Sequence, residues 1–163
     1  MHCYNKLAQY DSTINAATAL ISSPSIDPAA TREAYYLRAK AYEKNNTLDK
    51  ALADYKVLST NCMDEYGAEA EYRVAEYGYH NGDAAGAEKE IFAFIDKNTP
   101  HQYWLAKAFV LLSDIYISQG KDFDAKQYLL SLKENYKDNA EINTEIKARL
   151  DDINNREAKK VKK

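Results

Sequence analysis

Three segments of the chain repeat one pattern of small and large residues. Each segment contains one alanine that aligns it with the other two, and these alanines lie 36 and 38 positions apart. The segments and their alanines are Glu33–Leu58 with Ala51, Glu69–Phe94 with Ala87, and Lys107–Leu132 with Ala125. A repeat of this period is the signature of folds in which one small structural unit stacks on the next. This repeat constrains the fold more than any other feature of the chain.

Each copy predicts two helices joined by a short turn. In the first copy Tyr35 and Tyr42 lie seven positions apart with the small Ala39 between them, and the break Asn45–Thr47 follows. The second helix then has apolar residues at the spacings of three and four that mark one helical face. These residues are Leu48, Ala51, Leu52, Tyr55 and Leu58. We expect Thr47 to cap the second helix.

The second and third copies have glycine in the turn. Gly82 and Gly120 suit a helix end because glycine reaches positive φ without a Cβ clash, and Asp83 is placed to cap the next helix. We expect the buried faces to be formed by Val74, Ala75, Ala87, Ile91 and Phe94 in the second copy. In the third they are Phe109, Leu112, Ser113, Tyr116, Phe123, Ala125, Leu129 and Leu132.

The residues at these offsets resemble the tetratricopeptide repeat (TPR). The matching positions are Tyr35, Ala39, Tyr42, Ala51 and Tyr55 in the first copy, and Phe109, Leu112, Ser113, Tyr116, Gly120, Ala125 and Leu129 in the third. Three residues depart from the family's pattern: Arg38, Glu71 and Gly78. The resemblance implies an all-α, TPR-type α-solenoid of antiparallel helix pairs, with seven or eight helices wound into a right-handed superhelix.

This register predicts one solenoid domain over residues 1–163. Its expected parts are a partial N-terminal repeat (3–23), repeats at 27–60, 64–97 and 99–136, a capping helix (138–158) and a basic tail (159–163). Helix starts are expected at Asp27-Pro28, at a capping box from Thr99 to Gln102, and at another from Asp138 to Glu141. Because the N-terminal repeat (3–23) is only partial, we expect the chain to be the C-terminal fragment of a larger protein.

The composition of the chain disfavours a few classes of function. The formal net charge is −3 and charges of both signs are interspersed, which disfavours a nucleic-acid binder. No apolar run is long enough for a membrane span. Cys3 and Cys62 are far apart in sequence and are read as incidental thiols. The tail from Arg156 is read as a solvated chain end.

No pattern in the sequence indicates catalysis. His2, His80 and His101 have no carboxylate, cysteine or second histidine at ligand spacing, and Asp83 beside His80 is better explained as a helix cap. Phosphate loops and nucleophile motifs are missing from the sequence. We therefore expect no catalytic residue, no metal and no cofactor, and we expect that the chain is not an enzyme.

The 14 tyrosines exceed what the core positions require. In the resembled family the first helix of each pair lines a concave groove that binds a peptide or protein. Tyrosine suits such a surface because it offers a large ring and a hydroxyl. Carried over by position, the expected groove residues are Tyr36, Lys40, Lys44, Tyr72, Glu76, Tyr79, His80, Lys107 and Asp114.

The resemblance implies a non-enzymatic scaffold for protein–protein interaction. One alternative is a regulatory or docking module of a larger protein whose catalytic domain lies elsewhere. A further alternative is self-association through the N-terminal end. The stretch 71–116 is similar to TPR domains of bacterial cell-envelope proteins, which favours a periplasmic location over a cytoplasmic one.

Overall fold

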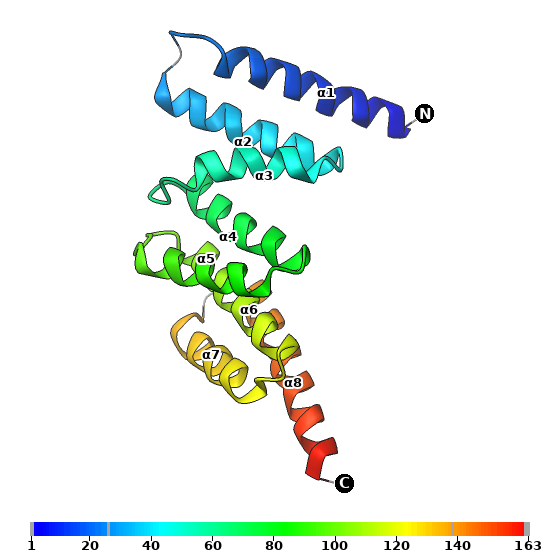
Figure 1. Cartoon of the computed structure of the whole chain (residues 1–163), viewed down its shortest axis with the longest axis vertical. Helices are drawn as coiled ribbons and strands as arrows, with labels where there is room; N and C mark the ends of the chain where they lie inside the picture. The colour runs from blue at the N-terminus through cyan, green and yellow to red at the C-terminus, as the bar shows by residue number, and fades with distance from the viewer. Residues whose placement is uncertain (1, 26, 138, 162–163) are drawn as a thin grey trace. The chain divides into compact units, whose positions relative to one another are not determined.

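The computed structural model describes residues 2–25, 27–137 and 139–161. These residues form eight helices and no strand, so the prediction of an all-α fold is confirmed (Figure 1). The contacts divide the helices into two compact units, unit 1 (Met1–Tyr77) and unit 2 (Gly78–Lys163). The boundary falls inside one helix, beside the Gly78 that departs from the repeat pattern. The predicted right-handed superhelix stays a prediction.

Unit 1 is built around its second helix. It contains α1 (His2–Ile21), α2 (Pro28–Lys44), α3 (Leu48–Leu58) and most of α4 (Glu65–His80). Helix α2 packs against both α1 and α3 and lies between them in Figure 1. The core joins α2, α3 and α4 through side chains that are fully buried: Ala39, Ala51, Tyr55, Leu58 and Ala70. Small residues at Ala39 and Ala51 allow the helices to approach closely, as the pattern predicts.

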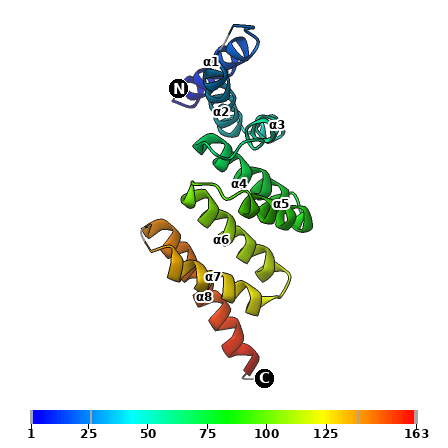
Figure 2. The same cartoon turned by 90° about the vertical axis from the view of Figure 1, so that its left-hand side faces the viewer.

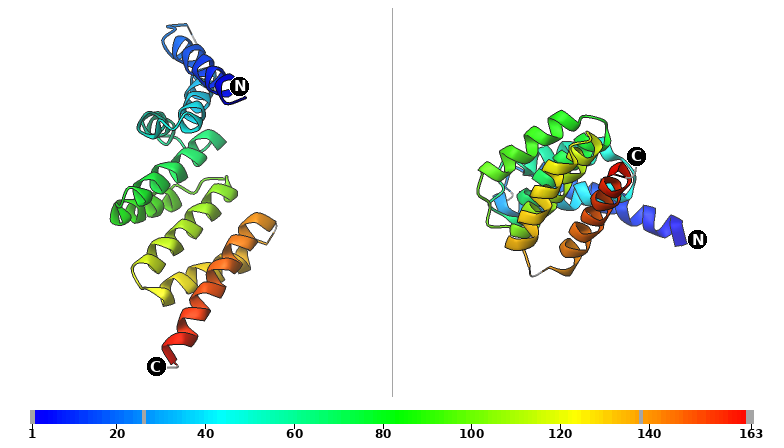
Figure 3. Two further views of the ribbon diagram at one scale, coloured as in Figure 1. Left: turned by 90° about the vertical axis from the view of Figure 1, so that its right-hand side faces the viewer. Right: turned by 90° about the horizontal axis from the view of Figure 1, so that it is seen from below.

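Unit 2 is built around α6. It contains the last residues of α4, then α5 (Ala84–Asp96), α6 (Gln102–Ser118), α7 (Asp122–Asn135) and α8 (Ala140–Val161). Helix α6 packs against α5, α7 and α8, and α7 also packs against α8 (Figures 2 and 3). The apolar stripe of α8 is buried, since Ile142, Ile146 and Ile153 have at most 1% of their surface exposed.

Most of the predicted turn and cap residues are confirmed. Gly82 and Gly120 have φ of 89° and 74°, so both occupy the left-handed region that favours glycine. The Asp27 carboxylate accepts hydrogen bonds from the backbone N–H groups of Ala29 and Ala30 at 3.0 and 3.2 Å. Asp83 accepts one from Gly86 N–H at 2.8 Å. These caps satisfy N–H groups that the first helical turn leaves without partners.

Two helix starts differ from the predictions, and the predicted cap of a third lies partly outside the described residues. The hydroxyl of Thr47 donates to the Tyr42 carbonyl oxygen at 3.1 Å, so Thr47 closes the end of α2 and makes no side-chain cap for α3. Helix α6 begins at Gln102, and the Gln102 amide donates to the Thr99 carbonyl oxygen rather than completing a capping box. Asn139 caps α8 by accepting from Glu141 and Ile142 N–H groups. Asp138 lies outside the described residues.

Two further predictions are corrected by burial and by helix length. Phe123 was expected on the buried face of α7, but 70% of its surface is exposed, because Asp122 and Ala125 occupy the buried side of this first turn and Phe123 lies outside it. The aligned alanines Ala51, Ala87 and Ala125 are at most 1% exposed, as predicted. Helix α8 continues to Val161 and so includes the start of the segment read as a tail.

Candidate functional site

One face of unit 1 gathers charged and aromatic side chains from α2 and α4. Helix α4 contributes Glu69, Arg73 and Glu76, which lie four and three positions apart and so share one side of the helix. Helix α2 contributes Tyr36 and Lys40, also four positions apart. We call this set, together with Glu43, Tyr66, Tyr72 and Tyr77, the α2–α4 face.

Glu69 is the centre of this face. It is only 3% exposed, and its carboxylate accepts hydrogen bonds from the Tyr36 hydroxyl at 2.9 Å and Lys40 Nζ at 2.8 Å. Arg73 Nε donates to the same carboxylate at 3.3 Å. A buried carboxylate is costly unless it is paired and hydrogen-bonded. Here two cations and one hydroxyl meet that requirement, so Glu69 joins α2 to α4.

A second set of bonds extends the network along α4 and back to α2. Arg73 Nη1 lies 2.7 Å from Glu76, and the Tyr72 hydroxyl donates to Glu76 at 2.6 Å. The Tyr77 hydroxyl donates to Glu43 of α2 at 2.5 Å. Three carboxylates and two cations therefore share the face, so it carries an excess of one negative charge.

The network moves the pKa values of Tyr36, Glu43 and Tyr77 away from neutrality. Burial, together with the hydrogen bond to Glu69, raises the pKa of Tyr36 well above its usual value. Burial and the bond to Glu43 do the same for the pKa of Tyr77. Burial alone would raise the pKa of Glu43, but the hydroxyl of Tyr77 and the charge of Arg73 outweigh it, and that pKa is lowered. These phenols stay protonated and this carboxylate stays charged at neutral pH.

Aromatic packing fixes the same side chains in place. The Tyr36 ring stacks on Tyr66, with ring centroids 4.5 Å apart and an interplanar angle of 23°. Lys40 Nζ lies 5.8 Å from the Tyr36 ring centroid, and the Arg73 guanidinium lies 5.5 Å from that of Tyr72. Both distances are within the range of a cation–π contact. The face therefore presents a rigid pattern of rings and charges.

The sequence placed four members of this face among its nine predicted groove residues. Tyr36, Lys40, Tyr72 and Glu76 are brought together by the structure, although Tyr72 is largely buried at 6% exposure. Lys44 lies exposed at the end of α2. The prediction missed Arg73 and Tyr77. The opposite charges of Glu69 and Arg73 at a spacing of four were a signal that could have identified Arg73.

The predicted groove residues of unit 2 have a different environment. Lys107 Nζ lies 2.7 Å from Glu145 of α8, and Asp114 accepts two hydrogen bonds of 2.6 Å from Arg149 of α8. The Tyr79 hydroxyl donates to the Asp114 carbonyl oxygen at 3.4 Å, and His80 is exposed beside Tyr79. Lys107 and Asp114 thus attach α8 to α6, and their role toward a partner stays a prediction.

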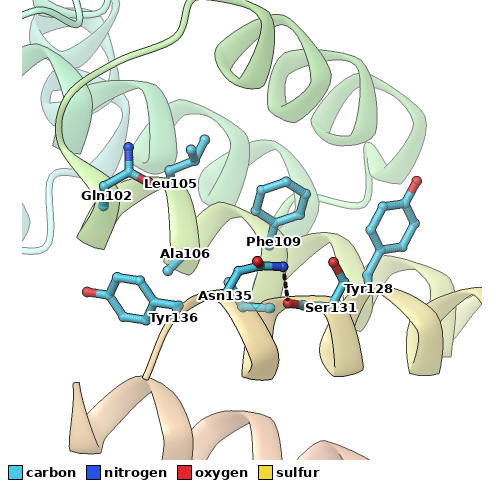
Figure 4. Close-up of a pocket in the computed structure, with 9 residues that line it drawn as sticks. Gln102, Leu105, Ala106, Phe109, Tyr128, Ser131, Asn135 and Tyr136 are labelled. Atoms are coloured by element: carbon cyan, nitrogen blue, oxygen red, sulfur yellow. Dashed lines mark hydrogen bonds between the residues drawn. The ribbon is translucent and has the colours of Figure 1, made fainter. Parts of the chain in front are cut away.

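Unit 2 also contains a pocket between α6 and α7 with a volume of about 210 Å³ (Figure 4). Its walls include the rings of Phe109, Tyr128 and Tyr136. Polar side chains, among them Gln102 and Asn135, lie at its edge in Figure 4. The repeat pattern did not predict this pocket, because it assigned Phe109 to a buried helix face.

A second hollow lies in unit 1 between α1 and α2. Its volume is about 270 Å³, and it is lined by small residues and by Leu20 and Leu37, which are 51% and 46% exposed. Because both leucines border the same hollow, their exposed side chains form part of one apolar patch rather than two isolated contacts with water. This end of unit 1 therefore presents an apolar surface.

The described residues contain neither a metal-ion cluster nor a membrane-spanning helix. No group of three His, Cys, Asp or Glu side chains in ranges 2–25, 27–137 and 139–161 is placed to hold a metal ion. Within the same ranges, none of the helices combines the length and apolar character needed to cross a bilayer. Cys62 is buried, with 2% of its surface exposed.

Comparison of the chain with protein-family models, with curated protein sequences and with solved structures found no match.

Proposed function

We propose that this chain is a non-enzymatic scaffold of the TPR type that binds a peptide or partner protein through the α2–α4 face. The observation that carries the proposal is the network around Glu69, which holds Tyr36, Lys40, Arg73 and Glu76 in one arrangement. Side chains that are already fixed lose little conformational entropy when a partner binds. A face held in this way is suited to recognition.

Charge favours a basic segment of the partner. Asp and Glu outnumber Lys and Arg in unit 1, whereas the two are balanced in unit 2, so the formal net charge of −3 belongs to unit 1. The α2–α4 face itself has one more carboxylate than cations. Complementary charge speeds association and selects among partners more than it adds affinity. The bacterial cell envelope, favoured by the sequence resemblance, remains the proposed location.

The test uses two tyrosines whose local contacts are alike. Tyr36 and Tyr103 are each partly buried, and each hydroxyl donates to a glutamate, at 2.9 Å to Glu69 and 3.2 Å to Glu141. Partners are captured from source-cell lysate with the unmodified chain, and their affinity is then measured for the Tyr36→Ala and Tyr103→Ala variants. We expect Tyr36→Ala to weaken binding by about tenfold or more, the loss of a hot-spot aromatic.

Tyr103→Ala controls for the general cost of removing a tyrosine, and circular dichroism of both variants checks that helicity is kept. Equal affinity of the unmodified chain and the Tyr36→Ala variant would refute recognition through this face.

The apolar end of unit 1 supports a second candidate, self-association through α1 and α2. Leu20 and Leu37 border the hollow between these helices and are about half exposed. A second copy of the chain would cover them. Light scattering over a range of concentrations should show a dimer that Leu37→Glu abolishes, and a monomer at the highest concentration would remove this candidate.

A further inference from the structure

The pocket between α6 and α7 is separate from the α2–α4 face and is not used by the function proposed above. Its lining comes from the first part of α6 and the last part of α7, including Gln102, Ala106, Ser131 and Asn135 (Figure 4). We propose that this pocket binds one uncharged aromatic side chain of the partner peptide. The inference rests on the proposed function, because it assumes that the partner is a peptide or protein.

The size of the pocket selects a single ring. Sites for drug-sized molecules and cofactors have volumes of roughly 300–1,000 Å³, whereas an apolar cavity of about 150 Å³ is enough to hold benzene. The pocket between α6 and α7 has about 210 Å³, which suits one ring with its methylene group. A nucleotide or a flavin is too large for this volume.

The charge of the lining selects an uncharged group. The lining residues are Gln102, Leu105, Ala106, Phe109, Tyr128, Ser131, Leu132, Asn135 and Tyr136. This set includes no Lys, Arg, His, Asp or Glu, so an ionic side chain placed there would lose hydration without gaining a counter-charge. Electrostatic complementarity therefore favours a neutral ring over a basic or acidic side chain.

The walls favour an aromatic ring over an aliphatic chain. Phe109 and Tyr128 lie with ring centroids 6.2 Å apart, and Tyr128 is also 5.6 Å from Tyr116, which holds it in position. Rings at such separations attract a further ring through edge-to-face or offset contacts. All three wall rings, those of Phe109, Tyr128 and Tyr136, are only partly buried. Partly covered rings around a small recess are typical of sites for an interface anchor.

Polar groups at the edge of the pocket can orient the ring. The Asn135 amide donates to the Ser131 carbonyl oxygen at 2.8 Å, and the Gln102 amide donates to the Thr99 carbonyl oxygen at 3.3 Å. Each amide also carries a carbonyl oxygen, which is an acceptor for a phenol or an indole N–H. A tyrosine or tryptophan side chain supplies that donor.

The proposal can be tested on the full chain with small probes. N-acetyl-tyrosinamide, N-acetyl-leucinamide and N-acetyl-lysinamide are titrated while backbone amide chemical shifts are recorded. We expect saturable shift changes for the tyrosine probe at Ala106, Phe109, Ser131 and Leu132, with affinity for the leucine and lysine probes at least about tenfold weaker. No localised change with the tyrosine probe, or equal binding of the leucine probe, would overturn the proposal.

A pair of variants locates the site. Ser131 is exposed at the pocket, so Ser131→Phe fills the recess at little cost to folding, whereas Gln127→Phe adds the same ring on α7 outside the lining. We expect Ser131→Phe to abolish the shift changes and Gln127→Phe to preserve them, with unchanged helicity in both. Equal binding to the two variants would show that the probe binds elsewhere.

The source of the ring is tested by comparing phenol with the peptide Gly-Gly-Tyr-Gly-Gly. Binding of the peptide supports a partner side chain, and binding of phenol alone would instead indicate a small-molecule site and refute the proposal. Because the Tyr36→Ala experiment reports on unit 1 and these probes report on unit 2, failure of one is distinguishable from failure of the other.

Discussion

Gly67 lies in the first turn of α4, where any side chain would collide with the preceding loop. A Cβ atom at this position would lie 1.7 Å from the Asn61 carbonyl oxygen and 2.8 Å from Arg32 Nη2. That carbonyl oxygen accepts a hydrogen bond from Arg32 at 2.9 Å, and Gly67 N–H donates to Asp64 at 2.7 Å. The substitution Gly67→Ala must therefore displace the loop and break contacts of Arg32.

Gly78 lies in the same helix and gives a matched comparison. A Cβ atom there would meet only the Cβ of Ala87 at 3.9 Å, which is an ordinary van der Waals contact. Alanine inside a helix is favoured over glycine by about 1 kcal/mol. We therefore expect Gly78→Ala to raise the free energy of unfolding by about 0.5–1 kcal/mol. Glycine to alanine is therefore expected to change the free energy of unfolding in opposite directions at two positions of α4.

The expected loss at Gly67 follows from adding the separate effects. Overpacking costs about 1–3 kcal/mol, and hydrogen bonds to a charged group such as Arg32 contribute about 1.5–3 kcal/mol. After subtraction of the helix-propensity gain of about 1 kcal/mol, Gly67→Ala should lower the free energy of unfolding by about 1.5–5 kcal/mol. Urea titrations followed by circular dichroism measure both variants. An unchanged midpoint for Gly67→Ala, or a lower one for Gly78→Ala, would show that the packing argument is wrong.

Three further perturbations test the charged contacts of the two units. Arg38 is 15% exposed and forms two hydrogen bonds of 2.7 and 2.8 Å to Asp54. Asp54→Ala removes this counter-charge and should lower the free energy of unfolding by about 3 kcal/mol, as measured by urea titration. Asp114→Ala should speed hydrogen exchange of α8 amides, with unchanged exchange in α2 as the control. Stability should fall as pH drops below about 4.5, because the pKa of Glu43 is lowered in the folded state and its ionised form is stabilising above that pH. Stability should also fall above about pH 10, because the pKa of Tyr77 is raised in the folded state, which favours the neutral phenol. Thermal unfolding measured across this pH range tests both expectations.

The helices and most turns could be predicted because their causes are local. The spacing of apolar residues set the helix faces, and the positive φ of Gly82 and Gly120 follows from the conformational freedom of glycine. Asn46 and Asn98 also adopt positive φ, at 57° and 52°, and close their turns in the same way. Asparagine is one of the few side chains that tolerate this region, so both positions were open to prediction from the sequence alone.

The pairing of charges could not be predicted because it depends on contacts between helices. Arg38 stands where the repeat pattern has leucine, and only the structure shows that Asp54 of α3 neutralises it. Glu69 is charged and opens the second copy of the repeat, and only the structure shows that the approach of α2 buries it. The register of one helix against the next decides such contacts, and a single sequence does not contain that register.

The same arrangement occurs in both units: a tyrosine and a lysine four positions apart bind glutamate side chains of another helix. In unit 1, Tyr36 and Lys40 both bind Glu69 of the next first helix, at 2.9 and 2.8 Å. In unit 2, Tyr103 and Lys107 have the same spacing of four and bind glutamates of α8, at 3.2 and 2.7 Å.

Aligned on the repeat, the second pair lies seven residues, or about two helical turns, nearer the start of its helix. Seven residues return to the same side of a helix, so both pairs join α2 to α4 and α6 to α8 on equivalent faces. The Tyr36 hydroxyl therefore serves helix packing through its bond to Glu69, and we propose that the Tyr36 ring is the part that contacts the partner. The Tyr36→Phe variant should consequently lose stability through the orphaned bond to Glu69 and still keep its partner, whereas Tyr36→Ala should lose both.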